Sequence, residues 1–186
     1  GNAVSGVFDL NLRKGNNRKR EYAVQIGVLG LEAALEGPFS KKYDGSYLVN
    51  YRYSTLELLS YTGIKIGGNV FPKYQDAAFN IYLPAGKAGS FTLFGMWGLS
   101  SLGAKAKRDI TKWETFSDKT DYNQKQMVGV AGISHIISMK DNKTYFKTTL
   151  SYSATDKTYN EDSLDNYYEP FNISNNRFTY QYARLS

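Results

Sequence analysis

The sequence predicts an all-β protein. We expect an antiparallel up-and-down meander of about eight strands that is part of a transmembrane β-barrel, or a small barrel of that kind. Apolar and polar residues alternate with a period of two over many segments. The chain has 16 Tyr and 10 Phe against 4 Pro, and short connections alternate with long ones. Its 186 residues are enough for one domain with a core.

The composition excludes several classes of protein. There is no Cys, so neither a disulfide scaffold nor a Cys-ligated metal site is possible. The longest uncharged stretch, residues 88–104, has 17 residues including four Gly, and a spanning helix needs roughly 20 apolar residues. The start of the chain shows no signal peptide, and its end lies within an expected strand. Either the protein is cytosolic or the sequence is a mature or excised form. The end within a strand favours a piece of a longer protein.

The strands of the first half follow from alternation. The second strand, residues 29–37, contains strong helix formers, but a helix there would end after about two turns at Gly37 and Pro38. We predict a strand because its neighbours are strands. The apolar rows of the other three strands are Tyr22, Val24, Ile26 and Val28; Tyr47, Val49, Tyr51 and Tyr53; and Phe79, Ile81 and Leu83.

The strands of the second half are less uniform. Residues 91–99 and 126–138 are apolar on more than one face and rich in Gly, which predicts either bulges or close packing. The next two strands alternate clearly, and with the first half they predict outward rows of Tyr, Phe, Val and Leu. Their apolar rows are Phe146, Thr148, Leu150 and Tyr152, and Phe178, Tyr180 and Tyr182.

The connections differ in length between the two ends of this meander. Short links at residues 40–46, 84–90 and 139–144 alternate with long loops at about 60–76, 100–123 and 155–176. Transmembrane barrels have short turns at one end, long loops at the other, and aromatic girdles. A lipocalin-type barrel also runs up and down, but need not sort its loops by length. The polar residues expected to face a wet lumen are Asn50, Arg52, Ser54, Lys147 and Ser151.

The first 39 residues carry a resemblance. Residues 5–12 read Ser-Gly-Val-Phe-Asp-Leu-Asn-Leu, residues 13–20 are polar and basic, and residues 36–39 read Glu-Gly-Pro-Phe. This order resembles the passage from plug to barrel in TonB-dependent outer-membrane receptors. The resemblance implies that residues 1–20 are the last plug strand and connector, and that residues 21–186 are the N-terminal barrel strands. It further implies that residues 36–39 form the turn closing the first hairpin, and that residues 47–59 are the third strand.

The resemblance implies that the chain is part of a transporter. Such receptors enclose a plug in a 22-stranded barrel. The parent protein would import a metal chelate or glycan across the outer membrane of a Gram-negative bacterium, powered by the TonB energy-coupling complex. The fragment would contact outer-membrane lipid, perform no transport alone, and self-associate through sheet edges near Glu21 and Ser186. The alternative is a self-contained eight-stranded barrel, membrane-embedded or lipocalin-like, acting as a binding or structural module.

No constellation predicts an enzyme, a cofactor or a metal. His135, the single histidine, has no Cys or second His nearby, so we read it as a strand residue near a turn. Glu32 and Glu36 share a strand face, and lumen-facing charge explains them without glycosidase chemistry. No Gly-rich phosphate loop is present. Catalytic, cofactor and metal residues are therefore predicted to be absent, and ligand-binding residues are not identified.

Charged clusters have simple interpretations. Basic side chains between residues 14 and 20 suit a solvated connector better than nucleic-acid binding. An acidic cluster near the C-terminus lacks EF-hand spacing, and a basic cluster in the 100–123 loop suits an anionic ligand, lipopolysaccharide or solubility equally. These three groups are Lys14, Arg18, Lys19 and Arg20; Glu161, Asp162, Asp165 and Glu169; and Lys105, Lys107, Arg108 and Trp113.

Overall fold

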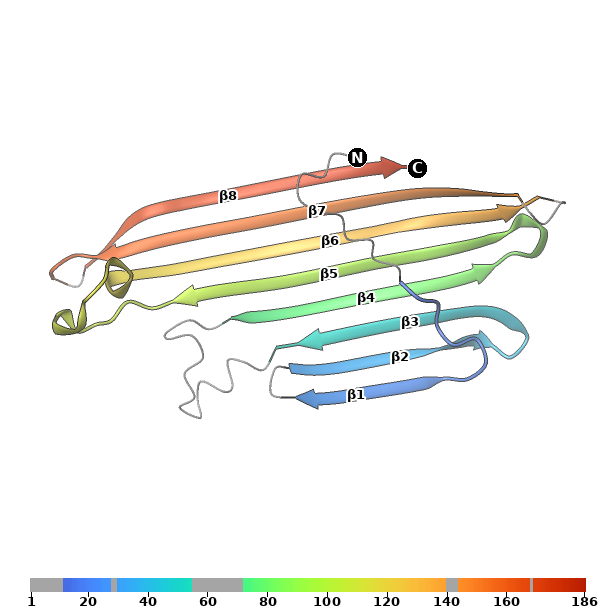
Figure 1. The fold of residues 1–186 in the computed structure, drawn as a ribbon, viewed down its shortest axis with the longest axis horizontal. Coiled ribbons are helices and arrows are strands. Elements are labelled where there is room, and N and C mark those ends of the chain that lie inside the picture. The colour runs from blue at the N-terminus through green and yellow to red at the C-terminus, as the bar shows by residue number, and fades with distance from the viewer. Residues whose placement is uncertain (1–11, 28–29, 55–71, 140–143, 168) are drawn as a thin grey trace.

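A computed structural model describes residues 12–27, 30–54, 72–139, 144–167 and 169–186. It confirms the all-β meander: one antiparallel sheet of eight strands in sequence order (Figure 1). The strands are β1 (Glu21–Gly27), β2 (Gly30–Ser40), β3 (Tyr43–Tyr53), β4 (Lys73–Pro84), β5 (Ser90–Ala104), β6 (Thr120–Ser138), β7 (Tyr145–Leu164) and β8 (Pro170–Leu185). Three short 3-10 turns are η1 (Gly86–Ala88), η2 (Ile110–Lys112) and η3 (Phe116–Lys119). None of the helical turns in these ranges is long and apolar enough to cross a membrane.

The sheet is open. In the described ranges β1 pairs only with β2 and β8 pairs only with β7, so β1 and β8 form the two edges of the sheet. An eight-stranded barrel would require β1 to pair with β8. The closed form considered from the sequence is therefore not the one observed, and both edges carry backbone groups available for pairing.

The register separates two faces. Residues directly opposite each other across the strands share a face, and the pairing of Leu35 with Val49, Val49 with Phe79 and Leu93 with Ile133 builds one apolar face. The other face is polar, with Glu32 opposite Arg52 and Asn50 opposite Ala78. The residues predicted to share a polar face do so within the strands: Asn50, Arg52, Lys147 and Ser151. We call these surfaces the apolar face and the polar face.

The last strand departs from the predicted rows. Tyr182 pairs with Ser153, and Phe178 pairs with Lys157, both on the polar face. The aromatic row Phe178, Tyr180 and Tyr182 is therefore on the face opposite the apolar one. Alternation in one strand shows which residues share a side but not which side it is. The pairing of β8 with β7 decides the side.

Two predicted connections are wrong in length. The loop expected at 100–123 spans only residues 105–119 between β5 and β6, and most of the expected 155–176 loop is strand, with β7 and β8 separated by residues 165–169. Here polar residues pair across strands that are polar on both faces, as Thr158 does with Arg177 and Asn160 with Asn175. Such strands do not show the apolar alternation that marks a half-buried strand.

The first hairpins also differ in detail. β1 pairs with β2 out to Gly27 and Gly30, so the first hairpin closes there and not at residues 36–39. Those residues belong to β2, which continues to Ser40, with a register shift between Pro38 and Ser40. An irregularity accommodates the proline in the strand. Of the predicted third strand, residues 47–53 lie in β3, and residues 55–59 lie outside the described residues. Residues 5–11 of the plug strand predicted at 5–12 also lie outside the described residues.

The Gly-rich strands β5 and β6 pair without a register shift, so their glycines are not bulges, and close packing explains Gly95 and Gly132. A Cβ atom at Gly95 would collide with the Phe79 ring, and one at Gly132 would lie 2.6 Å from the Phe94 ring. Large aromatic side chains therefore lie across glycines on neighbouring strands. This packing fills each face without a second layer.

The sheet has almost no hydrophobic core. Within the described ranges, Ala106, Leu164 and Pro38 are the buried residues with apolar side chains. The chain exposes 13672 Å², whereas a compact monomer of 21.0 kDa exposes about 9,000 Å². Apolar side chains such as Val24, Leu150 and Trp97 are 75%, 53% and 38% exposed. The apolar face therefore needs an apolar environment that the described chain does not supply.

Candidate functional site

A connector, residues 12–20, lies on the polar face close to the start of β1 (Figure 1). The Asn80 side-chain amide donates to the Leu12 carbonyl oxygen at 3.1 Å. The Lys14 Nζ atom lies 3.5 Å from the centre of the Tyr82 ring. At Gly15 a Cβ atom would collide with the carbonyl oxygen of Tyr47, so backbone meets backbone there. The connector thus touches β3 and β4 directly.

Glu36 on β2 holds the connector most tightly. Its two carboxylate oxygens accept from the Arg13 guanidinium at 2.7 and 2.6 Å, and the Asn16 backbone N–H donates to it at 2.7 Å. The Glu36 side chain is 13% exposed, whereas Arg13 is 66% exposed. A bidentate arginine pair fixes geometry as well as charge. The Glu36 carboxylate is therefore the main anchor.

A second anchor lies at the start of β1. Asn16 donates from its side-chain amide to Glu21 at 2.8 Å, and Lys19 pairs with the same carboxylate at 2.7 Å. The Asn16 side-chain oxygen accepts from the backbone N–H groups of Arg18 and Lys19, which forms a local turn. Two cations of the basic run, Lys14 and Lys19, thus have specific contacts with the sheet.

The polar face beyond the connector pairs its own charges. Arg52 pairs with Asp76 at 2.9 Å, and Asn50 donates to Glu32 at 2.7 Å. The two glutamates that the sequence placed on one strand face therefore do share it, but each has a separate partner. This face combines carboxylates, amides and guanidinium groups that bind water or a polar chain readily.

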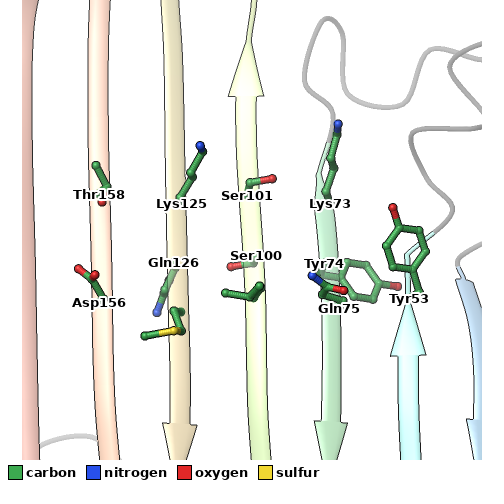
Figure 2. A pocket seen from close by; sticks show the side chains of 12 residues that line it. Tyr53, Lys73, Tyr74, Gln75, Ser100, Ser101, Lys125, Gln126, Asp156 and Thr158 are labelled. Carbon is green, nitrogen blue, oxygen red and sulfur yellow. The ribbon is translucent and has the colours of Figure 1, made fainter.

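The apolar face ends in a hollow of about 440 Å³, shown in Figure 2. Leu99 and Met127 line its apolar side, and Lys73, Ser101, Lys125 and Thr158 line its polar side. We call it the rim hollow. Both lysine side chains extend the same way along the sheet, toward the end where β5 stops (Figure 2). The cations thus lie at the boundary of the apolar face.

Asp156 is the one acid among the described residues that line the rim hollow, and it is paired with a cation. Asp156 accepts from Arg177 on β8 at 2.5 and 3.1 Å and from Thr179 at 3.3 Å. These contacts, the Arg177 hydrogen bond above all, lower the pKa of Asp156. Within the described ranges Lys125 forms no ion pair.

An apolar groove of about 320 Å³ adjoins the rim hollow and shares Met127 with it. Small residues on neighbouring strands form it, among them Ala77, Gly95 and Gly129, and Trp97 lines it. A Cβ atom at Gly129 would come no closer to Trp97 than 3.6 Å, so the groove has free space. We call it the small-residue groove.

Cations of the loop at residues 105–119 pair with acidic side chains of the loop and of the adjoining start of β6. Lys107 pairs with Asp118 at 2.8 Å, Arg108 pairs with Asp121 at 2.9 Å, and the Trp113 indole donates to the Lys107 carbonyl at 2.7 Å. The bond from Lys107, followed by the backbone N–H groups of Glu114 and Thr115, holds the pKa of Asp118 well below its usual range. These cations are therefore structural within the loop.

The other predicted residues have local roles. His135 lies in β6 beside the turn after β4, as predicted, with Nε2 2.7 Å from the Ala88 oxygen and its ring stacked on Phe91. In the acidic cluster, Asp165 accepts from the backbone N–H groups of Tyr167 and Glu169 and shapes the β7–β8 turn. No group of three potential metal-ligating side chains is found in the described part of the chain.

The rim hollow was not predicted from the sequence. Its signal is present: in β5 and β6 the apolar rows end at Ser101 and Lys125, which are cross-strand partners. Only the register shows that these row ends meet, with Lys73 opposite Ser101 on the other side. Comparison with known proteins adds no relative, because no family model, curated protein or solved structure matches this chain.

Proposed function

We propose that this chain is a membrane-embedded section of the barrel of an outer-membrane, TonB-dependent receptor. One observation carries the proposal. The chain's own connector lies on the polar face over β2, β3 and β4, whereas large side chains of the apolar face are exposed within the described residues. A protein folded in water does the opposite, because burial of apolar surface drives folding. A barrel wall in lipid has an apolar outer face and a polar inner face.

The height of the apolar face supports a membrane span. On β5 the row begins at Phe91 and gives way to Ser101 after Leu99; on β7 it begins at Phe146 and gives way to Asp156 after Ala154. Each row therefore covers nine residues, and a spanning strand needs roughly 9–11. Polar strand continues beyond this height, as expected where a barrel projects into water.

The connector supports the transporter part of the proposal. Residues 13–20 resemble the link between plug and barrel, and Arg13 and Asn16 of that link are bound to Glu36 on the polar face. In a closed barrel this face would be the lumen, where a plug lies. The parent protein then imports a nutrient of the metal-chelate or glycan class and relies on the TonB complex for energy. It is a transporter and not an enzyme.

The two tryptophans provide the test of membrane insertion. Trp97 lies on the apolar face and Trp113 in the 105–119 loop. We expect dibromo-phosphatidylcholine vesicles to quench the fluorescence of Trp97 strongly in the Trp113→Phe variant. Trp113, in the matched Trp97→Phe variant, should be quenched only weakly. Equal quenching of both, or of neither, would refute a membrane-embedded apolar face.

The coding sequence on both sides tests the transporter assignment separately. A TonB-dependent receptor requires an upstream plug of about a hundred residues and further alternating strands downstream. A gene that lacks either would show that the chain is a different kind of membrane sheet, even where Trp97 is quenched by lipid.

A further inference from the structure

Aromatic side chains form a continuous band on the polar face of β6, β7 and β8, three strands that lie side by side (Figure 1). Tyr159 is directly opposite Gln124 on one side and Asn176 on the other. Residues two positions apart in a strand share a face, so the rings two residues from these partners are diagonal neighbours of Tyr159. We call the following residues the aromatic band: Tyr122 of β6, Tyr159 of β7, and Phe178, Tyr180 and Tyr182 of β8.

The rings of the aromatic band are open to solvent. Phe178, Tyr180 and Tyr182 are 47%, 52% and 65% exposed, and the rings of Tyr122 and Tyr159 stack with their centres 6.4 Å apart. Lipid accounts for the exposed rings of the apolar face, whereas the proposed barrel leaves the polar face in water. Exposed apolar surface gathered in one place on a wet face is typical of an interaction site. The aromatic band is therefore a candidate ligand site.

Short hydroxyl side chains lie beside the rings of β8. Tyr180 is directly opposite Thr155, and Tyr182 is directly opposite Ser153. Neither partner is large enough to cover an aromatic ring, and each brings a hydroxyl group to the polar face. A ligand that matches this surface has flat apolar faces for the rings and hydroxyl groups at its rim.

The charges near the aromatic band are spread along the strands. Lys157 is opposite Phe178, and Arg184 lies six residues further along β8, which is about 20 Å in a strand. An anionic chelate or a nucleic-acid strand needs cations that converge on it or follow its backbone closely. The aromatic band thus suits a neutral ligand better than an anionic one. In the described parts of β7 and β8, the charged residues of the polar face are Lys147, Lys157, Glu161 and Arg184.

We propose that the aromatic band binds a neutral oligosaccharide. The C–H groups on the face of a sugar ring pack against the electron-rich face of an aromatic ring, and sugar hydroxyl groups bond to side-chain hydroxyls and amides. From Phe178 to Tyr182 the rings of β8 extend over about 14 Å, which exceeds one sugar ring and fits a short chain of sugars. This inference rests on the proposed function and selects the glycan from its two nutrient classes.

The height of the aromatic band suits a ligand that enters the barrel. The apolar row of β7 ends at Ala154, and Tyr180 is opposite the next residue, Thr155. The rings of β8 therefore lie on the lumen side, close to the level at which the wall leaves the membrane.

Isothermal titration calorimetry tests the proposal with the chain in dodecyl-dimethylamine oxide, a detergent that has no sugar headgroup. The neutral probes are maltohexaose, cellohexaose, mannohexaose and xylohexaose, and the anionic probes are ferric enterobactin and hexathymidylate. We expect at least one hexasaccharide to bind, and its monosaccharide to bind at least tenfold more weakly because it covers only one ring. Binding of an anionic probe alone, or of none of the hexasaccharides, would overturn the proposal.

Three variants show whether the rings are the site. Tyr180→Ala should weaken hexasaccharide binding about tenfold, the contribution of one stacked ring, whereas Tyr180→Phe keeps the ring and should retain most of the affinity. Tyr152→Ala is the matched control, because Tyr152 is 49% exposed but lies on the apolar face, opposite Ala131. It should leave the affinity unchanged. An equal loss in Tyr180→Ala and in either of the other two variants would refute ring stacking at the aromatic band.

Lipid quenching of Trp97 separates this inference from the proposed membrane location. Quenching by dibromo-phosphatidylcholine in every variant shows that the sheet is folded in the membrane, so that lost sugar binding then concerns the aromatic band alone. A protein whose Trp97 is quenched but which binds no hexasaccharide refutes the glycan site and leaves the membrane section standing. Absence of quenching refutes the membrane location itself, whatever the sugars do.

Discussion

Replacing Glu36 with Ala should release the connector from the polar face. The substitution removes the acceptor of the Asn16 backbone N–H and of both Arg13 bonds. A hydrogen bond to a charged group is worth about 1.5 kcal/mol or more. Because the Arg13 guanidinium is 66% exposed, its ion pair contributes less than about 1 kcal/mol. The loss of docking free energy is therefore about 2 kcal/mol, which raises the released population about 30-fold.

Limited trypsin digestion measures this release. Cleavage after Arg18, Lys19 and Arg20 requires the connector to leave the sheet, so the rate follows the released population when cleavage is slow. We expect the Glu36→Ala protein, in detergent micelles, to be cut there about 30-fold faster. Glu32→Ala is the matched control, because Glu32 lies on the same face of β2 but accepts from Asn50 and not from the connector. Equal cleavage rates in the two variants would refute the anchoring role of Glu36.

The 105–119 loop and the β4–β5 turn provide two further predictions. The hydrogen bond from the Thr111 hydroxyl, followed by that from Lys112, lowers the pKa of Asp109 to about 2, and the pKa of Asp118 is also lowered. The two carboxylates therefore contribute fully to the order of the loop above about pH 4. This contribution is lost as the pH falls through their lowered pKa values. In the Trp97→Phe protein, the fluorescence emission of Trp113 should stay constant from pH 7 to about pH 4 and shift toward that of an exposed indole at lower pH. The additional substitution Asp118→Asn should already produce part of this shift at pH 7. Constant emission down to pH 2 would contradict the loop contacts. In the turn, Gly86 has φ of +57° with open space around it, and Gly89 has φ of +85° with the Ile136 carbonyl oxygen against it. Gly86→Ala should cost about 1 kcal/mol of unfolding free energy and Gly89→Ala distinctly more in denaturant titrations followed by circular dichroism; the reverse order would show that the turn is built differently.

Much of the sheet follows from the sequence, because alternation is a local property. Rows such as Tyr47, Val49, Tyr51 and Tyr53 predict a strand whatever the neighbours are. The short turns at the ends of β2, β4 and β6 also have local signals. The polar parts of β7 and β8 have none, since residues such as Thr158 and Asn176 carry no apolar period. Their strand structure depends on pairing with a neighbour.

The candidate sites needed tertiary information for the same reason. The sequence showed a basic connector and carboxylates at Glu32 and Glu36, but not that Glu36 binds Arg13 and Asn16 while Glu32 binds Asn50. Nor did it show that Lys73 and Lys125 lie on either side of Ser101. These pairs are separated by many residues, and a shift of one residue in register would move every side chain to the other face.

The sequence by itself thus determined the fold class, most strands and the presence of an apolar row on each. Only the tertiary structure decided that the rows of β1 to β7 join into one exposed face, that the aromatic row of β8 lies on the polar face, and that the connector lies on the polar face over β2 to β4. Strand formation depends on neighbours along the chain, whereas the composition of a face depends on register between strands. The two edges of the open sheet follow from that same pairing.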